Sequence, residues 1–340
     1  MESEDPHLGN QHTESAEPIA AFVFLGRRLP KYLTLNIRKF IQNWPNVKVL
    51  LIVDNPKSVP RAISSRIEVI RYSRSPETSA ALTGLKLNPR FRSGFWIKTL
   101  ERLIALEAGH SEYPSRRLLH IEGDVVILPG FPWDSLSEFG DLSWLRLTED
   151  EDIAALVLTR NAAETSWLVR NIISVAQKDN STSDMRALKA VAKSNPEKVT
   201  YLPSSPSDSL SESIGVFDAL PLGLWLFGVD PKNLAGKIRN HHTDPRHMQS
   251  FLGWRVQGTD NGGLEVSNGS KNIRVNSLHL HSKSLRVLRA KNLAGLAEVG
   301  GREKSSWSTV AFGYWLLEQA REVFSPHGLR AIRRRLLGRY

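Results

Sequence analysis

The 340-residue sequence contains no cysteine. Disulfide bonds, thiolate metal sites and cysteine nucleophiles are therefore excluded, and any bound metal must rely on oxygen and imidazole ligands. No apolar run approaches the roughly 18 residues that a membrane-spanning helix needs, and the acidic, polar start of the chain is unlike a signal peptide. We accordingly expect a cytoplasmic protein.

Three widespread catalytic motifs are also missing. The sequence has no G-x-x-x-x-G-K-[ST] loop, no G-x-G-x-x-G turn after a strand and no G-x-S-x-G elbow. P-loop, Rossmann dinucleotide and α/β-hydrolase chemistry therefore lose their usual support.

The charge of the chain is strongly positive. The formal net charge is +10, whereas the apolar share of 41% and charged share of 24% are ordinary for a globular protein. Such an excess favours a polyanionic partner, which could be nucleic acid, an anionic membrane or a phosphorylated ligand. Charge alone does not choose among them.

The positive charge is concentrated towards the end of the chain. Residues 1–18 lack apolar periodicity and are expected to form a disordered leader, whereas residues 326–340 are expected to form a basic amphipathic helix. Five arginines there would suffice for peripheral contact with an anionic membrane at its inner face, and a plain soluble terminus is the alternative. They are Arg330, Arg333, Arg334, Arg335 and Arg339.

Apolar patterning predicts an α/β fold. Strands are expected at 19–25 and 47–53, with a helix between them in which Leu33, Ile37 and Phe40 recur at helical spacing. Such a βαβ unit implies parallel strands, whose ligands sit beyond their carboxyl ends, where Gly26 and Asp54 lie. Further strands are expected around 67–72, 117–121, 142–147, 153–158, 199–203 and 272–283, with helices at about 161–178 and 183–194.

The central chemical signal is Glu122-Gly123-Asp124, which follows an expected strand and precedes a turn. Carboxylates two residues apart at a strand end can both face one pocket. Mg²⁺ and Mn²⁺ prefer such oxygen ligands and usually complete their coordination with substrate phosphates. The alternative is a solvated turn, because E-x-D is common by chance.

Further candidate residues lie near the ends of other elements. His279 and His281 share one face of an expected strand and could complete a metal site, with Lys283 contacting phosphate. The competing interpretation is a pair of half-buried, hydrogen-bonded histidines.

Three more charged residues remain ambiguous from the sequence. Asp218 suits both a helix N-cap and a catalytic carboxylate. Lys98 and Arg102 lie one turn apart on an expected helix, where they could meet a diphosphate or pair with Glu101 and Glu107.

Several segments together resemble one group of bacterial GT-A glycosyltransferases, enzymes with a DxD-like motif found among uncharacterised surface-polysaccharide biosynthesis proteins. They are spread in order over residues 19–285: FVFLGRRLPKYLTLNIRKF, GFWIKTLERLIAL, LLHIEGDVVILPGFP, SDMRALKAV, GVFDALPLGLWLFGVDPKN and NSLHLHSK.

The resemblance implies a GT-A fold, with a Rossmann-like mixed central sheet flanked by helices in a single continuous body of two lobes. Residues 19–130 would bind a sugar nucleotide, and residues 131–325 would shape the site of a glycan or lipid-linked acceptor. A divalent cation, Mn²⁺ or Mg²⁺, would stabilise the departing diphosphate.

The resemblance also assigns roles to individual residues. Asp124 would ligate the metal together with His279 or His281, and Glu122 would contact ribose or metal-bound water. Asp54 would lie near the nucleotide base, and Asp218 would orient or deprotonate the acceptor. Gly123 departs from the family pattern, which usually has a polar residue there.

Two other functions compete with this one. A nucleotidyltransferase can use a similar sheet and acidic metal site, but it usually has a Gly-rich basic loop after the first strand, where this chain has only Gly26-Arg27-Arg28. A basic nucleic-acid-binding protein would show steeply salt-dependent binding to oligonucleotides. We expect no nucleic-acid partner.

Overall fold

The computed structural model describes residues 18–87, 94–227, 251, 253–281, 283 and 285–290. Residues 1–17 of the expected leader and the expected basic helix at 326–340 lie outside this range. Of the helices formed by the described residues, none has the length and apolar character that crossing a membrane requires.

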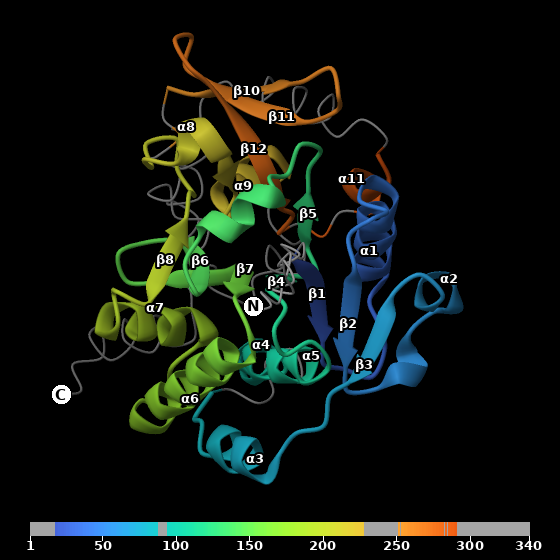
Figure 1. The fold of residues 1–340 in the computed structure, drawn as a ribbon, viewed down its shortest axis with the longest axis vertical. Coiled ribbons are helices and arrows are strands. Elements are labelled where there is room, and N and C mark those ends of the chain that lie inside the picture. The colour runs from blue at the N-terminus through green and yellow to red at the C-terminus, as the bar shows by residue number, and fades with distance from the viewer. Residues whose placement is uncertain are drawn as a thin grey trace, which may run out of the picture.

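A seven-stranded sheet forms the centre of the fold (Figure 1), with the strand order β3-β2-β1-β4-β7-β6-β8. Neighbours among β1 to β4 are parallel, β7 runs antiparallel to both β4 and β6, and β8 is parallel to β6. The sheet is therefore mixed. Its strands are β1 (Ile19–Phe24), β2 (Val49–Val53), β3 (Glu68–Arg71), β4 (Leu118–Ile121), β6 (Leu142–Arg146), β7 (Asp152–Thr159) and β8 (Val199–Leu202).

Helices cover both faces of this sheet, which explains why its inner strands are apolar without alternation. Leu33, Ile37 and Phe40 of α1 pack on one face, and residues of α4 to α7 pack on the other. The helices are α1 (Lys31–Asn43), α2 (Arg61–Ser64), α3 (Pro76–Thr83), α4 (Phe95–Ile104), α5 (Leu106–Glu112), α6 (Ala162–Lys178), α7 (Asp184–Ser194), α8 (Ser211–Ile214), α9 (Pro221–Phe227) and α11 (Leu285–Arg289), with short 3₁₀ turns η1 (Pro56–Ser58) and η3 (Asp134–Glu138).

A smaller sheet lies at the top of Figure 1 and has the order β10-β11-β12-β5. All its neighbours on this path are antiparallel, and β9 adds to β12 in parallel. Its strands are β5 (Val125–Ile127), β9 (Val216–Phe217), β10 (Arg255–Gly258), β11 (Leu264–Ser267) and β12 (Asn272–His279). Because β5 follows β4 after a short turn, the small sheet begins where a central strand of the large sheet ends.

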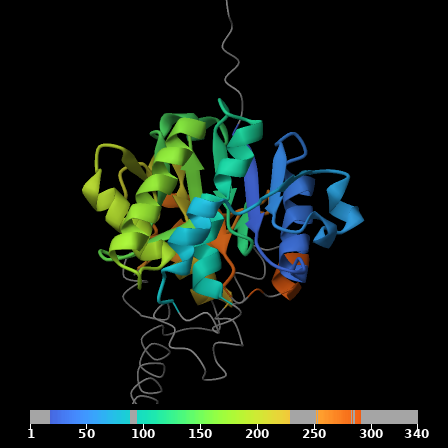
Figure 2. The same cartoon turned by 90° about the horizontal axis from the view of Figure 1, so that it is seen from below.

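Helix α11 packs against α1, and both views show the two side by side (Figure 2). The Nζ of Lys39 on α1 donates to the carbonyl oxygen of Ala290, just beyond α11, over 2.9 Å. This contact fixes the segment that follows β12 onto the first helix of the chain.

The expected α/β class and the mixed central sheet flanked by helices are confirmed. Helix α3 lies between β3 and α4, where no helix is predicted from the sequence. Ser75 caps that helix by accepting a hydrogen bond from the amide of Thr78, and Pro76 occupies its first turn. The expected lobe boundary at residue 130 stays a prediction.

Gly223 of α9 is the position where the fold tolerates a side chain least. A Cβ atom there would lie 2.0 Å from the carbonyl oxygen of His279, a backbone atom that cannot rotate away. We expect Gly223→Ala to destabilise the chain by about 1–3 kcal/mol, as other overpacked sites do. Thermal unfolding measures this. Gly84→Ala is the control, since the nearest atom to a Cβ there is 3.8 Å away, and equal melting temperatures for the two variants would contradict the prediction.

Candidate metal centre

The turn between β4 and β5 carries the acidic motif and is held by α1. The side chain of Asn36, buried on that helix, donates to the carbonyl oxygens of Gly123 at 3.2 Å and Val125 at 2.6 Å. A Cβ at Gly123 would lie 3.2 Å from a methyl carbon of Leu33. The small residue in the middle of the motif thus lets the turn lie close against α1.

The end of β12 brings His279 to this turn. His279 pairs with Val125 in the antiparallel ladder between β12 and β5, and the amide of Leu280 donates to the carbonyl oxygen of Asp124 over 2.7 Å. Two segments that are far apart in the sequence are therefore fixed in register by backbone hydrogen bonds.

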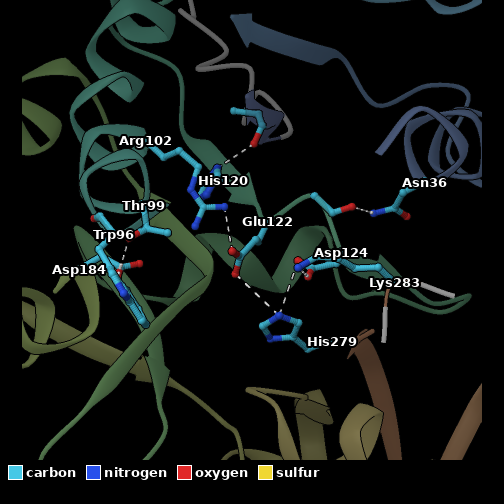
Figure 3. Close-up of polar contacts among 12 residues, drawn as sticks. Asn36, Trp96, Thr99, Arg102, His120, Glu122, Asp124, Asp184, His279 and Lys283 are labelled. Carbon is cyan, nitrogen blue, oxygen red and sulfur yellow. Dashed lines mark hydrogen bonds and ion pairs between the residues drawn. The ribbon is translucent and has the colours of Figure 1, made fainter. Parts of the chain in front are cut away.

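Glu122, Asp124 and His279 form a group whose donor atoms all lie within 4.8 Å of one another. The Nε2 of His279 is 3.6 Å from Oδ1 of Asp124 and 3.8 Å from Oε2 of Glu122 (Figure 3). Its Nδ1 is 2.8 Å from the carbonyl oxygen of Ala219, which can only accept, so Nδ1 carries a proton. Nε2 is therefore the ring nitrogen that faces the carboxylates.

This group fits a divalent cation. Ions that bind oxygen at about 2.1 Å place adjacent ligands about 3 Å apart and opposite ligands about 4 Å apart. The two distances from Nε2 of His279, 3.6 Å to Asp124 and 3.8 Å to Glu122, fall between these values. Two carboxylates suit Mg²⁺ or Mn²⁺, and the imidazole adds a nitrogen donor held in one tautomer by its second hydrogen bond.

Two cations flank the group. Nη1 of Arg102 lies 2.8 Å from Oε1 of Glu122, and Nζ of Lys283 lies 3.2 Å from Oδ2 of Asp124. Each carboxylate thus presents one oxygen to a cation and the other to His279. The alternative interpretation of Arg102, an ion pair with Glu101 or Glu107 on its own helix, is therefore not what the structure shows.

These neighbours set the charge of the two acids. Burial raises the pKa of Asp124, but the positive charges of Lys283 and His279 outweigh it and hold that pKa well below its usual value. For Glu122 the attraction of Arg102 likewise outweighs burial and lowers the pKa. Both acids are therefore ionised at neutral pH, as metal ligands must be.

The same attraction acts on the histidine in the opposite direction. Burial lowers the pKa of His279, but Asp124 and then Glu122 outweigh burial and raise it to about 9. In the metal-free protein His279 is therefore an imidazolium at neutral pH. A metal ion that binds Nε2 must displace that proton, so affinity should rise with pH.

Asp184 is a site residue that the sequence did not single out. It is buried at the start of α7, and its Oδ1 accepts a hydrogen bond from Oγ1 of Thr99 over 3.0 Å (Figure 3). Burial raises its pKa to about 6, although the charge of Arg102 opposes this shift. In the sequence, Ser183 followed by an acid indicates only a helix start.

Asp218 is buried, whereas a general base would need to be open to the substrate. Its carboxylate accepts hydrogen bonds from the amides of Leu222 at 3.0 Å, Gly223 at 2.7 Å and His279 at 3.0 Å, and its side chain is buried. Both oxygens are therefore engaged by backbone. These contacts fit the N-cap interpretation, and they also fix the backbone of His279.

The remaining expected site residues do not belong to this metal-ligand group. Oδ1 of Asp54 accepts from the amide of Gly26 over 3.0 Å at the carboxyl ends of β1 and β2. Lys98 is half-buried one turn before Arg102 on α4. The ring of His281 has its centroid 6.4 Å from that of His279, and among the described residues the metal-ligating group includes His279 rather than His281.

No family model and no curated protein matches this sequence. Solved structures with some likeness include the galactosyltransferase LgtC with donor and acceptor sugar analogs, at 16% identity and a TM-score of 0.41 over 85% of this chain and 98% of that chain. The glycosyltransferase GlyE of Streptococcus pneumoniae gives 10% identity and a TM-score of 0.42 over 89% and 64%. The PaToxG glycosyltransferase gives 12% identity and a TM-score of 0.37 over 53% and 71%.

The pKa of His279 tests the charge arrangement. Because Asp124 supplies the largest attraction and burial opposes it, Asp124→Asn should lower this pKa from about 9 by at least one unit in metal-free buffer. A pH titration of the ring nitrogens by NMR measures it. In the control variant Asp54→Asn, which alters an exposed carboxylate outside the cluster, the value should stay near that of the native chain. A histidine that still titrates near pH 9 without the Asp124 charge would contradict the arrangement.

Asp184 should limit stability at neutral pH. Its folded-state pKa of about 6 exceeds the unfolded value of 3.8, so the stability contributed by the neutral acid is present below pH ~4 and is lost as the pH rises to 6. The free energy of unfolding of Asp184→Asn, relative to that of the native chain, should therefore rise by on the order of 2–3 kcal/mol between pH 4 and pH 8. Chemical unfolding at both pH values in the presence of EDTA tests this. Asp141→Asn serves as an exposed control, and a gain shared by both variants would refute the assignment.

Proposed function

We propose that this chain is a metal-dependent glycosyltransferase of the GT-A type that transfers a sugar from a nucleoside-diphosphate sugar to a glycan or lipid-linked acceptor. The observation that carries the proposal is the Glu122, Asp124 and His279 group, with ligand atoms within 4.8 Å, flanked by the cations Arg102 and Lys283. The ordered resemblance of six sequence segments to this family supports it independently.

In this proposal Asp124 and His279 hold the cation, Mn²⁺ or Mg²⁺, and Glu122 contacts it directly or through water. A bound cation supplies Lewis-acid stabilisation of the departing diphosphate. Lys283 neutralises Asp124 in the structure, and with a cation held at that carboxylate its ammonium group would be available to contact phosphate. Lys98 lies one turn before Arg102 on α4. In this proposal it is a second cationic side chain that contacts the diphosphate.

The donor nucleotide would bind at the carboxyl ends of β1, β2 and β4. Asp54 fixes the amide of Gly26 at the start of the loop between β1 and α1, which suits a role in shaping the base pocket. Substrates of α/β sheets bind beyond such strand ends.

The carboxylates near the reacting sugars have different roles in this proposal. Asp218 acts as a positioning residue, since three backbone amides engage its oxygens. Asp184 is the better placed acid, because its charge interacts with Arg102 and Glu122 in the same site. We assign it to orienting hydroxyl groups of the donor or acceptor.

Asp124→Asn tests the proposal. In the native chain, Mn²⁺ together with either UDP or GDP should raise the melting temperature, and the variant should lose that shift because one ligand charge is gone. Differential scanning fluorimetry with and without the metal measures both. Asp141→Asn, an exposed acid paired with Arg160, should keep the full shift.

A native chain without any nucleotide-dependent shift would count against the proposal. The products distinguish it from a nucleotidyltransferase: glycosyl transfer releases a nucleoside diphosphate, whereas nucleotidyl transfer from a nucleoside triphosphate releases pyrophosphate. Incubation with Mn²⁺ and a panel of sugar nucleotides, followed by chromatography of the nucleotides, identifies which is formed.

A further inference from the structure

A cavity lies on the side of α1 that faces α11, and cations are prominent in its lining. Its volume is about 630 Å³, and its lining includes Arg28 from the loop after β1, Lys31 and Arg38 from α1, and Arg289 from α11. The apolar residues Leu29 and Leu35 also line it. Three separate segments thus direct positive charge at one space.

These four cations are exposed and form no ion pair within the described part of the chain. No acid is among the described residues that line the cavity, and none of the four side chains forms an ion pair with any described residue. Like charges gathered around one space repel each other, and a bound anion relieves that repulsion. Arginine pairs with phosphate through two parallel hydrogen bonds, which lysine complements as a point charge.

The cavity and the metal centre share two elements. Lys31 lines the cavity, whereas its neighbour Tyr32 has its ring 5.6 Å from Nζ of Lys283 in the metal centre. Lys31 and Tyr32 are consecutive on α1, so the cavity and the metal centre involve the same turn of this helix. Arg289 follows Lys283 by six positions along the chain, and α11 packs on α1.

We propose that this cavity binds a phosphate group carried by the acceptor. The assignment to the acceptor rests on the proposed function, whereas the anion site itself rests on the cavity and its four cations. The phosphate is a monoester or diester borne either by a glycan or by a lipid. The cavity is distinct from the donor diphosphate site, which the metal centre provides.

The double variant Arg38→Gln and Arg289→Gln tests the anion site with pyrophosphate as the probe. In metal-free buffer at low salt, calorimetry should show affinity for pyrophosphate that is about tenfold weaker than in the native chain, because two charge-assisted contacts are lost. Arg170→Gln removes an exposed arginine from α6 and should keep the native affinity. Equal affinity in the double variant and the native chain overturns the proposal.

Nucleotide binding separates this proposal from the proposed function. The double variant should keep the melting shift with Mn²⁺ and UDP or GDP that Asp124→Asn loses. A double variant that loses this shift places the cavity in the donor site and overturns its assignment to the acceptor. If nucleotides do not shift the melting temperature of the native chain, but the double variant still binds pyrophosphate more weakly than the native chain, the proposed function fails while the anion site stands.

Vesicles identify what carries the phosphate. The double variant should cosediment less than the native chain with phosphatidylglycerol vesicles if the phosphate belongs to a lipid, and equally if it belongs to a soluble glycan. Phosphatidylcholine vesicles give the baseline. Because the C-terminal arginines are the same in both chains, they do not contribute to the difference.

Discussion

The antiparallel pairing of β12 with β5 is the contact on which the candidate site depends. Its last pair sets His279 opposite Val125, and the next amide, that of Leu280, bonds to the carbonyl of Asp124. Backbone geometry therefore determines which imidazole meets the acids. Asn36 on one side and Asp218 on the other hold the two strand ends, so the ligands are positioned by residues that themselves make buried hydrogen bonds. Such support is what keeps a metal site within narrow geometric limits.

Charge compensation is the second condition for the site. Two acids and a further carboxylate, Asp184, are buried within one region, and buried like charges are costly unless cations neutralise them. Arg102 and Lys283 provide that neutralisation, and His279 adds a third positive charge when protonated. Burial nevertheless raises the pKa of Asp184 to about 6. Replacing the His279 proton by a divalent ion at this candidate site would raise its net charge by one unit.

Much of the fold was predictable from the sequence because buried parallel strands and amphipathic helices leave strong periodic patterns, as at 19–25 and around Leu33 and Ile37. Asp124 and His279 were predictable as ligand types at strand ends, although spacing alone did not separate His279 from His281. Asp184 and Asn36 were not predictable. Their positions depend on how α7 packs on α4 and how α1 packs on the β4–β5 turn, and a side chain's tertiary neighbours have no local sequence pattern. The ambiguity at Asp218 had the same origin, since only the register of β12 shows that its carboxylate meets the amide of His279.

The short stretch from β12 to α11 connects the candidate metal centre to the surface of α1. It starts at His279, passes Lys283 in a left-handed backbone conformation with a φ of 49°, and ends at Arg289 against α1. A lysine in that conformation has few alternative backbone states that keep both ends in place. Evolution of this segment is therefore constrained at both of its ends, because an insertion would displace either the metal centre or α11. The length of the segment should vary less than its composition.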